Sequence, residues 1–273
     1  MRRRNNRNFF MSCNFAIQVE NATVTTAGNE ILHNISWQVK RGERCFILGA
    51  NGAGKTTLVK VVTGFAWPKF GAKVQVLGET FGEVSIAAVR KRIAWVSPLI
   101  QEWLNENFEG LEMVLSGLEG TLGFFRHPSQ EDLDKAHAVM KDLRCEHLAK
   151  RTFHTMSSGE QLKILIARAL LTDPELMILD EPSVYLDIAG REFLLNTIDQ
   201  LAKERPGLTM VFITQRIEDI LPVFDRGMIL REGSILAEGS REEVLTEENL
   251  KRAFGLDIRL IQTETGRLWS VIR

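Results

Sequence analysis

GANGAGKTT, residues 49–57, is the stretch that decides the fold of this chain. It fits the pattern G-x-x-x-x-G-K-[ST], in which glycines let backbone N–H groups turn inward around an anion. The short apolar run Cys45–Leu48 precedes it, and Leu58, Val61 and Val62 follow at helical spacing. A buried strand, this loop and a helix whose N-terminus faces the same point form the context that the pattern requires. We therefore predict a loop that binds the phosphates of a nucleotide.

Side chains of this loop add to the backbone cradle. Lys55 is expected to reach the β- and γ-phosphates, and the hydroxyl group of Thr56 is expected to ligate Mg²⁺. The predicted nucleotide-binding residues are Gly49, Ala50, Asn51, Gly52, Ala53, Gly54, Lys55, Thr56 and Thr57.

Two acidic residues follow a second apolar strand, Leu176–Leu179. Carboxylates at the end of a buried strand are costly unless a positive charge meets them. With a nucleotide at the glycine-rich loop, that charge is predicted to be Mg²⁺, held by Asp180. Glu181 is then placed to polarise the attacking water.

A third motif, Met156-Ser-Ser-Gly-Glu160, precedes the apolar helical stretch LKILIARALL, residues 162–171. Ser157 and Glu160 have the spacing of a capping box, which is a structural interpretation. The same small-residue helix start also offers hydroxyl and N–H groups to an anion. The order of the three motifs along the chain is more specific than any one of them.

Strand and helix patterns alternate, which predicts an α/β fold with a mainly parallel sheet. Phe15–Val19 and Ile35–Val39 alternate apolar and polar residues, as strands with one buried face do. Glu109–Gly117 and Glu131–Leu143 have helical patterns within a stretch that contains no convincing strand. Further strands are predicted at Val74–Leu77, Ile93–Val96, Leu176–Leu179, Thr209–Ile213, Met228–Leu230, Ile258–Ile261 and Leu268–Ile272.

The domain prediction follows from these patterns. Residues 1–11 form a basic, flexible tail. Residues 12–98 and 176–273 form the nucleotide-binding α/β core, with an antiparallel region near the N-terminus. Residues 99–175 form an inserted helical subdomain that ends in the Ser157 motif and its helix.

Composition excludes several classes of function. The 273 residues carry 34 basic and 35 acidic side chains, so a nucleic-acid partner bound by bulk charge is not expected. The longest uncharged stretch, Asn8–Val19, is too short to cross a bilayer. Three cysteines without a CxxC pair indicate reduced thiols. The expected location is cytoplasmic, at the inner face of a membrane where another subunit holds the chain.

At these motifs the chain resembles the ATP-binding-cassette (ABC) ATPase family, over about Asn14–Ile272. Met156–Glu160 is similar to the family signature, usually LSGGQ, and EPSVYLD, residues 181–187, to the Asp-Glu motif that runs into the D-loop. The resemblance implies a P-loop NTPase core and a head-to-tail dimer of two copies. Each copy closes its signature over the ATP of the other. It implies ATP contacts from Ser157, Gly159 and Glu160, and a place for Asp187 in the dimer interface.

The segment that begins RGMILREGS at Arg226 resembles ATPase subunits of metal-chelate importers, as well as molybdate-type ATPases and related stand-alone proteins. This implies an ATP-hydrolysing subunit that drives an integral-membrane permease for a metal chelate or an oxyanion. The alternative is a soluble, slowly hydrolysing ATPase that acts as an ATP-gated switch on another machine.

Departures from the family pattern favour the alternative. No aromatic residue lies near Thr26, where one usually stacks on adenine. Ser97-Pro98 stands where a glutamine senses Mg²⁺ and water, and the nearest glutamine is Gln101. Gln215 stands at the position of the switch histidine. The predicted catalytic residues are therefore Glu181, Gln215 and Gln101, and we expect slow hydrolysis.

Overall fold

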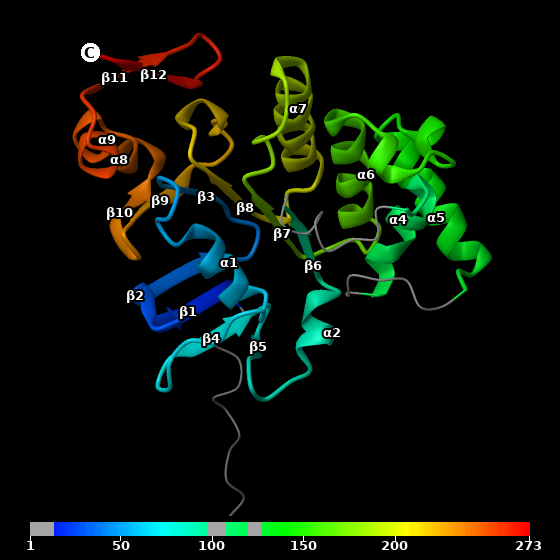
Figure 1. Cartoon of the computed structure of the whole chain (residues 1–273), viewed down its shortest axis with the longest axis horizontal. Helices are drawn as coiled ribbons and strands as arrows, with labels where there is room; N and C mark the ends of the chain where they lie inside the picture. The colour runs from blue at the N-terminus through cyan, green and yellow to red at the C-terminus, as the bar shows by residue number, and fades with distance from the viewer. Residues whose placement is uncertain (1–13, 98–106, 120–126) are drawn as a thin grey trace, which may run out of the picture.

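The computed structural model describes residues 14–97, 107–119 and 127–273. Within these residues the larger sheet has the strand order β10-β9-β3-β8-β7-β6 (Figure 1). Strands β9, β3, β8, β7 and β6 run parallel, and β10 pairs with β9 in the antiparallel sense. The predicted α/β fold with a mainly parallel sheet is confirmed. The strand bounds are β3 Arg44–Leu48, β6 Ile93–Val96, β7 Leu176–Asp180, β8 Thr209–Thr214, β9 Arg226–Arg231 and β10 Ser234–Ser240.

Burial explains why the central strands have no polar face. Every residue of β7 and β8 is buried, as is every residue of β3 after its first. Strands covered on both faces have near-continuous apolar sequences rather than alternating ones. The polar side chains of this sheet therefore gather where its strands end.

A second, antiparallel sheet has the order β2-β1-β4-β5. Helix α1 (Lys55–Val62) packs between the two sheets, because it contacts β1 and β2 on one side and β7 on the other. The predicted strands at Phe15–Val19 and Ile35–Val39 are parts of longer strands. The bounds are β1 Phe15–Thr26, β2 Asn29–Lys40, β4 Lys73–Val76 and β5 Glu79–Thr80.

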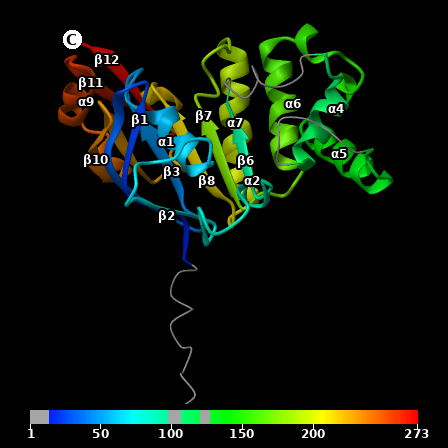
Figure 2. The ribbon, with the colours of Figure 1, turned by 60° about the horizontal axis from the view of Figure 1, so that its bottom comes forward.

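Three helices contact one another and lie beside the β6 edge of the larger sheet (Figures 1 and 2). They are α4 (Gly110–Leu115), α5 (Gln130–Asp142) and α6 (Ser158–Leu170), and α6 also contacts β6 and α7 (Ile188–Glu204). Both predicted helices of this region are observed, the first continuing into the 3₁₀ turn η1 (Ser116–Glu119). The division into a core and a helical subdomain stays a prediction, and its tail, residues 1–11, lies outside the described residues.

The C-terminal part contains short elements that reach back to the sheet. Helices α8 (Arg241–Val244) and α9 (Glu247–Phe254) follow β10, and the hairpin of β11 (Ile258–Gln262) and β12 (Leu268–Ile272) contacts the 3₁₀ turn η4 (Ile217–Asp219). The remaining elements are α2 (Ile86–Arg90), η2 (Glu146–Leu148) and η3 (Phe153–Thr155). In the described ranges, every helix is too short or too polar to span a bilayer.

Candidate nucleotide site

The glycine-rich loop runs from the carboxyl end of β3 to the first turn of α1. Gly54 caps α1 with φ of 98°, a left-handed backbone, and a Cβ there would lie 2.7 Å from the Leu32 side chain. Only glycine fits both constraints. From outside, the Gly233 N–H donates to the Ala53 carbonyl at 3.1 Å. The loop is therefore shaped by backbone packing, as an anion cradle requires.

Lys55 is folded back into this loop and is only 4% exposed. Its Nζ donates to the carbonyl oxygens of Gly49 at 2.8 Å and Ala50 at 2.9 Å. It also forms an ion pair with Glu181 Oε1 at 3.0 Å. The structure thus brings together the predicted phosphate-binding lysine and the predicted catalytic carboxylate.

Asp180 lies beside that pair and is 2% exposed. The Thr56 and Ser97 hydroxyl groups lie near its carboxylate, but neither carboxylate oxygen has a partner at full hydrogen-bond geometry among the described residues. Burial, with a further contribution from Glu181, raises the pKa of Asp180 to about 6, against the opposing effects of Lys55 and the Thr56 and Ser97 hydroxyl groups. A buried carboxylate whose oxygens lack well-formed hydrogen bonds, next to a hydroxyl group, suits a hard divalent cation. The residues present therefore fit Mg²⁺.

Glu181 has an unusual backbone that its sequence position did not indicate. Its φ is 50°, in the left-handed region that favours glycine, and its N–H donates to the Ile213 carbonyl at 2.9 Å. A non-glycine residue in this conformation costs of the order of 1 kcal/mol, and such strain gathers at functional sites. The turn directs the carboxylate back toward Lys55.

Gln215 follows β8, which lies between β3 and β7. Leu48 of β3 pairs with Thr214, and Asp180 pairs with Ile213, so the ends of all three strands meet at one edge of the sheet. In open α/β sheets, ligands bind at the carboxyl ends of the strands. Gln215 therefore stands at the same edge as the loop and Glu181. Pro98 and Gln101 lie outside the described residues.

The Ser157 motif is a complete capping box at the start of α6. The Ser157 N–H donates to Glu160 Oε2 at 2.8 Å, and the Glu160 N–H donates to Ser157 Oγ at 3.4 Å. The Ser157 N–H and its hydroxyl group, which donates to Glu160 Oε2 at 3.0 Å, lower the pKa of Glu160, and Arg151 forms an ion pair with it at 2.7 Å. Gly159 has open space where a Cβ would stand. The structural interpretation of Ser157 and Glu160 is confirmed.

The helix that carries this motif and the helix that follows the loop lie apart in the fold. Both ribbon views place α6 on the opposite side of β7 from α1 (Figures 1 and 2). Ser157 is exposed, so its hydroxyl group is accessible to another molecule.

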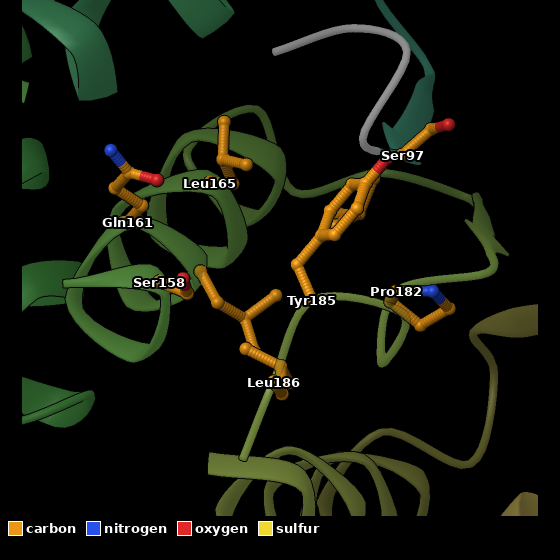
Figure 3. Close-up of a pocket in the computed structure, with 9 residues that line it drawn as sticks. Ser97, Ser158, Gln161, Leu165, Pro182, Tyr185 and Leu186 are labelled. Carbon is orange, nitrogen blue, oxygen red and sulfur yellow. The ribbon is translucent and has the colours of Figure 1, made fainter. Parts of the chain in front are cut away.

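The D-loop lines a small pocket beside this helix start. The pocket has a volume of about 160 Å³, and in Figure 3 the ring of Tyr185 points from the D-loop toward Ser97. Tyr185 is 70% exposed and Ile188 is 84% exposed. Asp187 caps α7 by accepting from the Gly190 N–H at 2.7 Å. Two large apolar side chains thus face solvent next to the motif.

The end of the β1–β2 hairpin, where the family pattern usually has an aromatic residue that stacks on adenine, is polar. Thr26 is exposed and pairs with Asn29. Sequence reasoning missed Ser183, Arg191 and Asp219, which join the segments behind Glu181 and Gln215. No local pattern marks them, because their contacts join residues far apart in the chain.

Fold and site together define a P-loop nucleotide-binding protein. A family profile described as ABC transporter matches residues 32–184. The uncharacterized ABC transporter ATP-binding protein YlmA of Bacillus subtilis is 37% identical over 246 residues, which cover 90% of this chain and 93% of that protein. The chain belongs to the ABC transporter family, as an ATP-binding protein of that family, and the predicted family is confirmed.

Two further relatives carry more specific descriptions. The manganese transport system ATP-binding protein MntB of Bacillus subtilis is 28% identical over 245 residues, covering 88% of this chain and 93% of that protein. A solved structure described as an inward-facing, metal-chelate type ABC transporter has a TM-score of 0.77 and 26% identity, covering 95% of this chain and 98% of that one.

Proposed function

We propose that this chain is the ATP-hydrolysing subunit of a membrane transporter and works as a dimer closed over ATP. The meeting of Lys55, Asp180 and Glu181 at one edge of the sheet carries this proposal. The chain would act in the cytoplasm, at the inner face of the membrane, bound to permease subunits. The descriptions of MntB and of the metal-chelate type transporter support a metal ion or a metal chelate as the transported cargo. An oxyanion is the alternative cargo that the sequence resemblance implies.

The chain supplies groups that bind the phosphates of ATP and groups that would bind Mg²⁺. Backbone N–H groups of Gly49–Gly54 and the start of α1 hold the phosphate oxygens, and Lys55 neutralises their charge. The Thr56 hydroxyl group and the Asp180 carboxylate would hold Mg²⁺, which would supply positive charge to the phosphate oxygens. The Asp180 oxygens, which lack well-formed hydrogen bonds to the described residues, support this assignment.

Hydrolysis needs a base, and Glu181 is placed to provide it. In the structure its carboxylate is paired with Lys55 at 3.0 Å. When a γ-phosphate binds Lys55, the carboxylate is free to accept a proton from water as the water oxygen attacks the γ-phosphorus. Gln215 can donate one hydrogen bond at the same edge. The bond from the γ-phosphorus to the bridging oxygen breaks, giving ADP and phosphate.

Closure over ATP requires the signature of a second copy. Ser157 is exposed, a Cβ at Gly159 would meet open space, and α6 lies on the opposite side of β7 from α1. Two copies arranged head to tail would each place this helix start against the other's γ-phosphate. The helix N-terminus favours an anion there. Exposed Tyr185 and Ile188 suit burial in the same interface.

Phosphate release tests the proposal. Purified protein at saturating ATP and Mg²⁺ should release phosphate, and Lys55→Ala should reduce the rate to background because the charge partner of the phosphates is lost. Lys60→Ala, on the same helix but away from the loop, is the matched control and should keep the rate. Equal hydrolysis by wild type and Lys55→Ala would show that the site is assigned wrongly.

A second function, an ATP-gated switch that works without a permease, is favoured by Gln215. A glutamine amide donates a hydrogen bond but cannot become a cation as histidine can. Isolation of the chain from native membranes distinguishes the two functions. Co-purification with a protein that has many apolar spans supports the transporter, and its absence supports the switch.

A further inference from the structure

A fully buried carboxylate joins the segments that follow Glu181 and Gln215. Asp219 is 0% exposed and lies in η4, four residues after Gln215. Its Oδ2 accepts a hydrogen bond from Ser183 Oγ at 2.5 Å, and its Oδ1 accepts from Arg191 Nε. Ser183, itself 2% exposed, lies two residues after Glu181.

The two segments need such a connection because the sheet stops holding them at this point. Strands β7 and β8 pair as far as Asp180 and Ile213. Among the described residues, the last main-chain hydrogen bond between the two segments runs from the Glu181 N–H to the Ile213 carbonyl. Beyond it, the Ser183–Asp219 hydrogen bond joins the two segments through side chains.

Charge pairing keeps Asp219 in place. A carboxylate removed from water is costly unless it is paired and hydrogen-bonded. Arg191, which is 15% exposed in its side chain, supplies the cation from α7, four residues after Asp187. The same carboxylate therefore contacts the segment after Glu181, the turn after Gln215 and the helix after the D-loop.

The opposite side of η4 is held by the C-terminal hairpin. Glu218 accepts hydrogen bonds from the N–H of Ser270 at 3.1 Å and from its hydroxyl group. Arg267 donates to the Glu218 carbonyl at 3.1 Å and forms a two-point ion pair with Glu192 of α7, at 2.7 and 3.0 Å. These contacts fix η4 to the body of the protein but do not touch the segment after Glu181.

We propose that Ser183 and Asp219 are positioning residues for ATP hydrolysis, which hold Glu181 and Gln215 at the separation that the attacking water requires. This inference rests on the proposed function. Displacement of a reacting group by about 1 Å is enough to reduce a rate by about a hundredfold. Both side chains are buried and hydrogen-bonded to each other, so we expect their loss to lower turnover and to leave ATP binding unchanged.

Ser183→Ala tests this role with little change to the fold, because it removes one hydroxyl group and leaves the Asp219–Arg191 pair intact. We expect kcat to fall at least tenfold and KM for ATP to change less than twofold. Ser183→Thr restores the hydroxyl group and should return at least half of the wild-type kcat. Ser270→Ala removes the neighbouring hydroxyl contact to Glu218 and is the matched control, with kcat within twofold of wild type.

Three results would overturn the inference. An unchanged kcat in Ser183→Ala, with wild type active, rejects the positioning role and leaves the proposed function standing. A rise in KM at constant kcat would assign Ser183 to binding instead. Absence of hydrolysis in wild type rejects the proposed function, and the positioning role with it.

Discussion

At the scale of single residues, Asp180 has surroundings that disfavour its charge. Its carboxylate is buried, neither of its oxygens has a partner at full hydrogen-bond geometry among the described residues, and burial raises its pKa to about 6. An unsatisfied buried charged group costs upward of about 1–3 kcal/mol. Asp180 therefore carries a stability cost that a bound cation would remove.

Asp180→Asn should raise the melting temperature of the protein in EDTA at pH 8, by about 3–6 °C, since the charge is removed. The variant should lose the further rise that Mg²⁺ gives to the ATP-bound wild type. Differential scanning fluorimetry with and without Mg²⁺ measures both effects. Asp142→Asn, on an exposed position of α5, is the control and should change neither. A lower melting temperature in EDTA would contradict the account of Asp180.

Gln215 gives a second prediction at this scale. Loss of an oriented donor costs about 10²–10³ in rate, and a glutamine replaces part of that donor. We expect wild-type kcat below about 0.1 s⁻¹, roughly tenfold under the low end of typical enzymes. Gln215→His should raise kcat with little change in ATP affinity, because the contact matters most in the transition state. If steady-state phosphate release is equal or slower, Gln215 is already competent or lies away from the reacting atoms.

At the scale of elements, the β11–β12 hairpin depends on the ionised form of Glu218. Burial acts to raise the pKa of Glu218, but hydrogen bonds from Ser270 and the nearby Arg191 outweigh it, so the pKa lies below its usual 4.5. A depressed carboxyl pKa adds stability above the unfolded-state pKa, and the gain is lost as pH falls through the folded-state value. The hairpin should therefore loosen in acid.

Glu218→Gln should lower the melting temperature at pH 7 by a few degrees, because a charged hydrogen bond of about 1.5–3 kcal/mol is weakened. The difference from wild type should shrink as pH falls below about 4.5. Thermal unfolding followed by circular dichroism between pH 3 and 7 measures it. Glu83→Gln, at an exposed position, serves as control. A difference that is constant with pH would assign the effect to packing instead of charge.

Short-range sequence patterns predicted the strands, the helices and the glycine-rich loop, because the features that form them lie close together in the chain. Strands β7 and β8 are apolar throughout because both faces are covered, and the loop 49–57 carries its geometry in its glycines. The Ser183–Asp219 bond spans 36 residues and the Arg267–Glu192 pair spans 75. Such contacts leave no periodic signal in the sequence. The backbone of Glu181 was also missed, because nothing in a single glutamate marks a φ of 50°.

At the scale of the whole molecule, one chain contains only half of each proposed ATP site. Glu181→Gln keeps the shape of the site but removes the base, so ATP should stay bound uncleaved. We expect this variant to be a dimer with ATP and Mg²⁺ and a monomer without nucleotide, as measured by light scattering. A persistent monomer would argue against the closed dimer.

Two serine-to-arginine substitutions, one at the signature and one at another helix start, test whether the signature forms the dimer interface. Ser157→Arg in the Glu181→Gln background should prevent dimer formation, because the side chain would fill the space that the phosphate needs. Ser129→Arg replaces another exposed serine that caps a helix in the same capping-box geometry, at the start of α5. It should leave the ATP-dependent dimer intact. Equal effects of the two substitutions would point to helix capping and not to the signature.

The ion pair between Lys55 and Glu181 favours anionic ligands over neutral ones at the loop. A ligand that enters must take Lys55, 4% exposed, away from an oppositely charged neighbour at 3.0 Å. A polyanionic ligand gives the Lys55 ammonium group a new negative partner in place of Glu181. A neutral nucleoside would separate the two charged side chains and give neither of them a new partner. Base and sugar alone therefore gain little here. For inhibitor discovery, uncharged compounds that block this protein should be sought at other surfaces, and competitors for the loop should carry an anionic group.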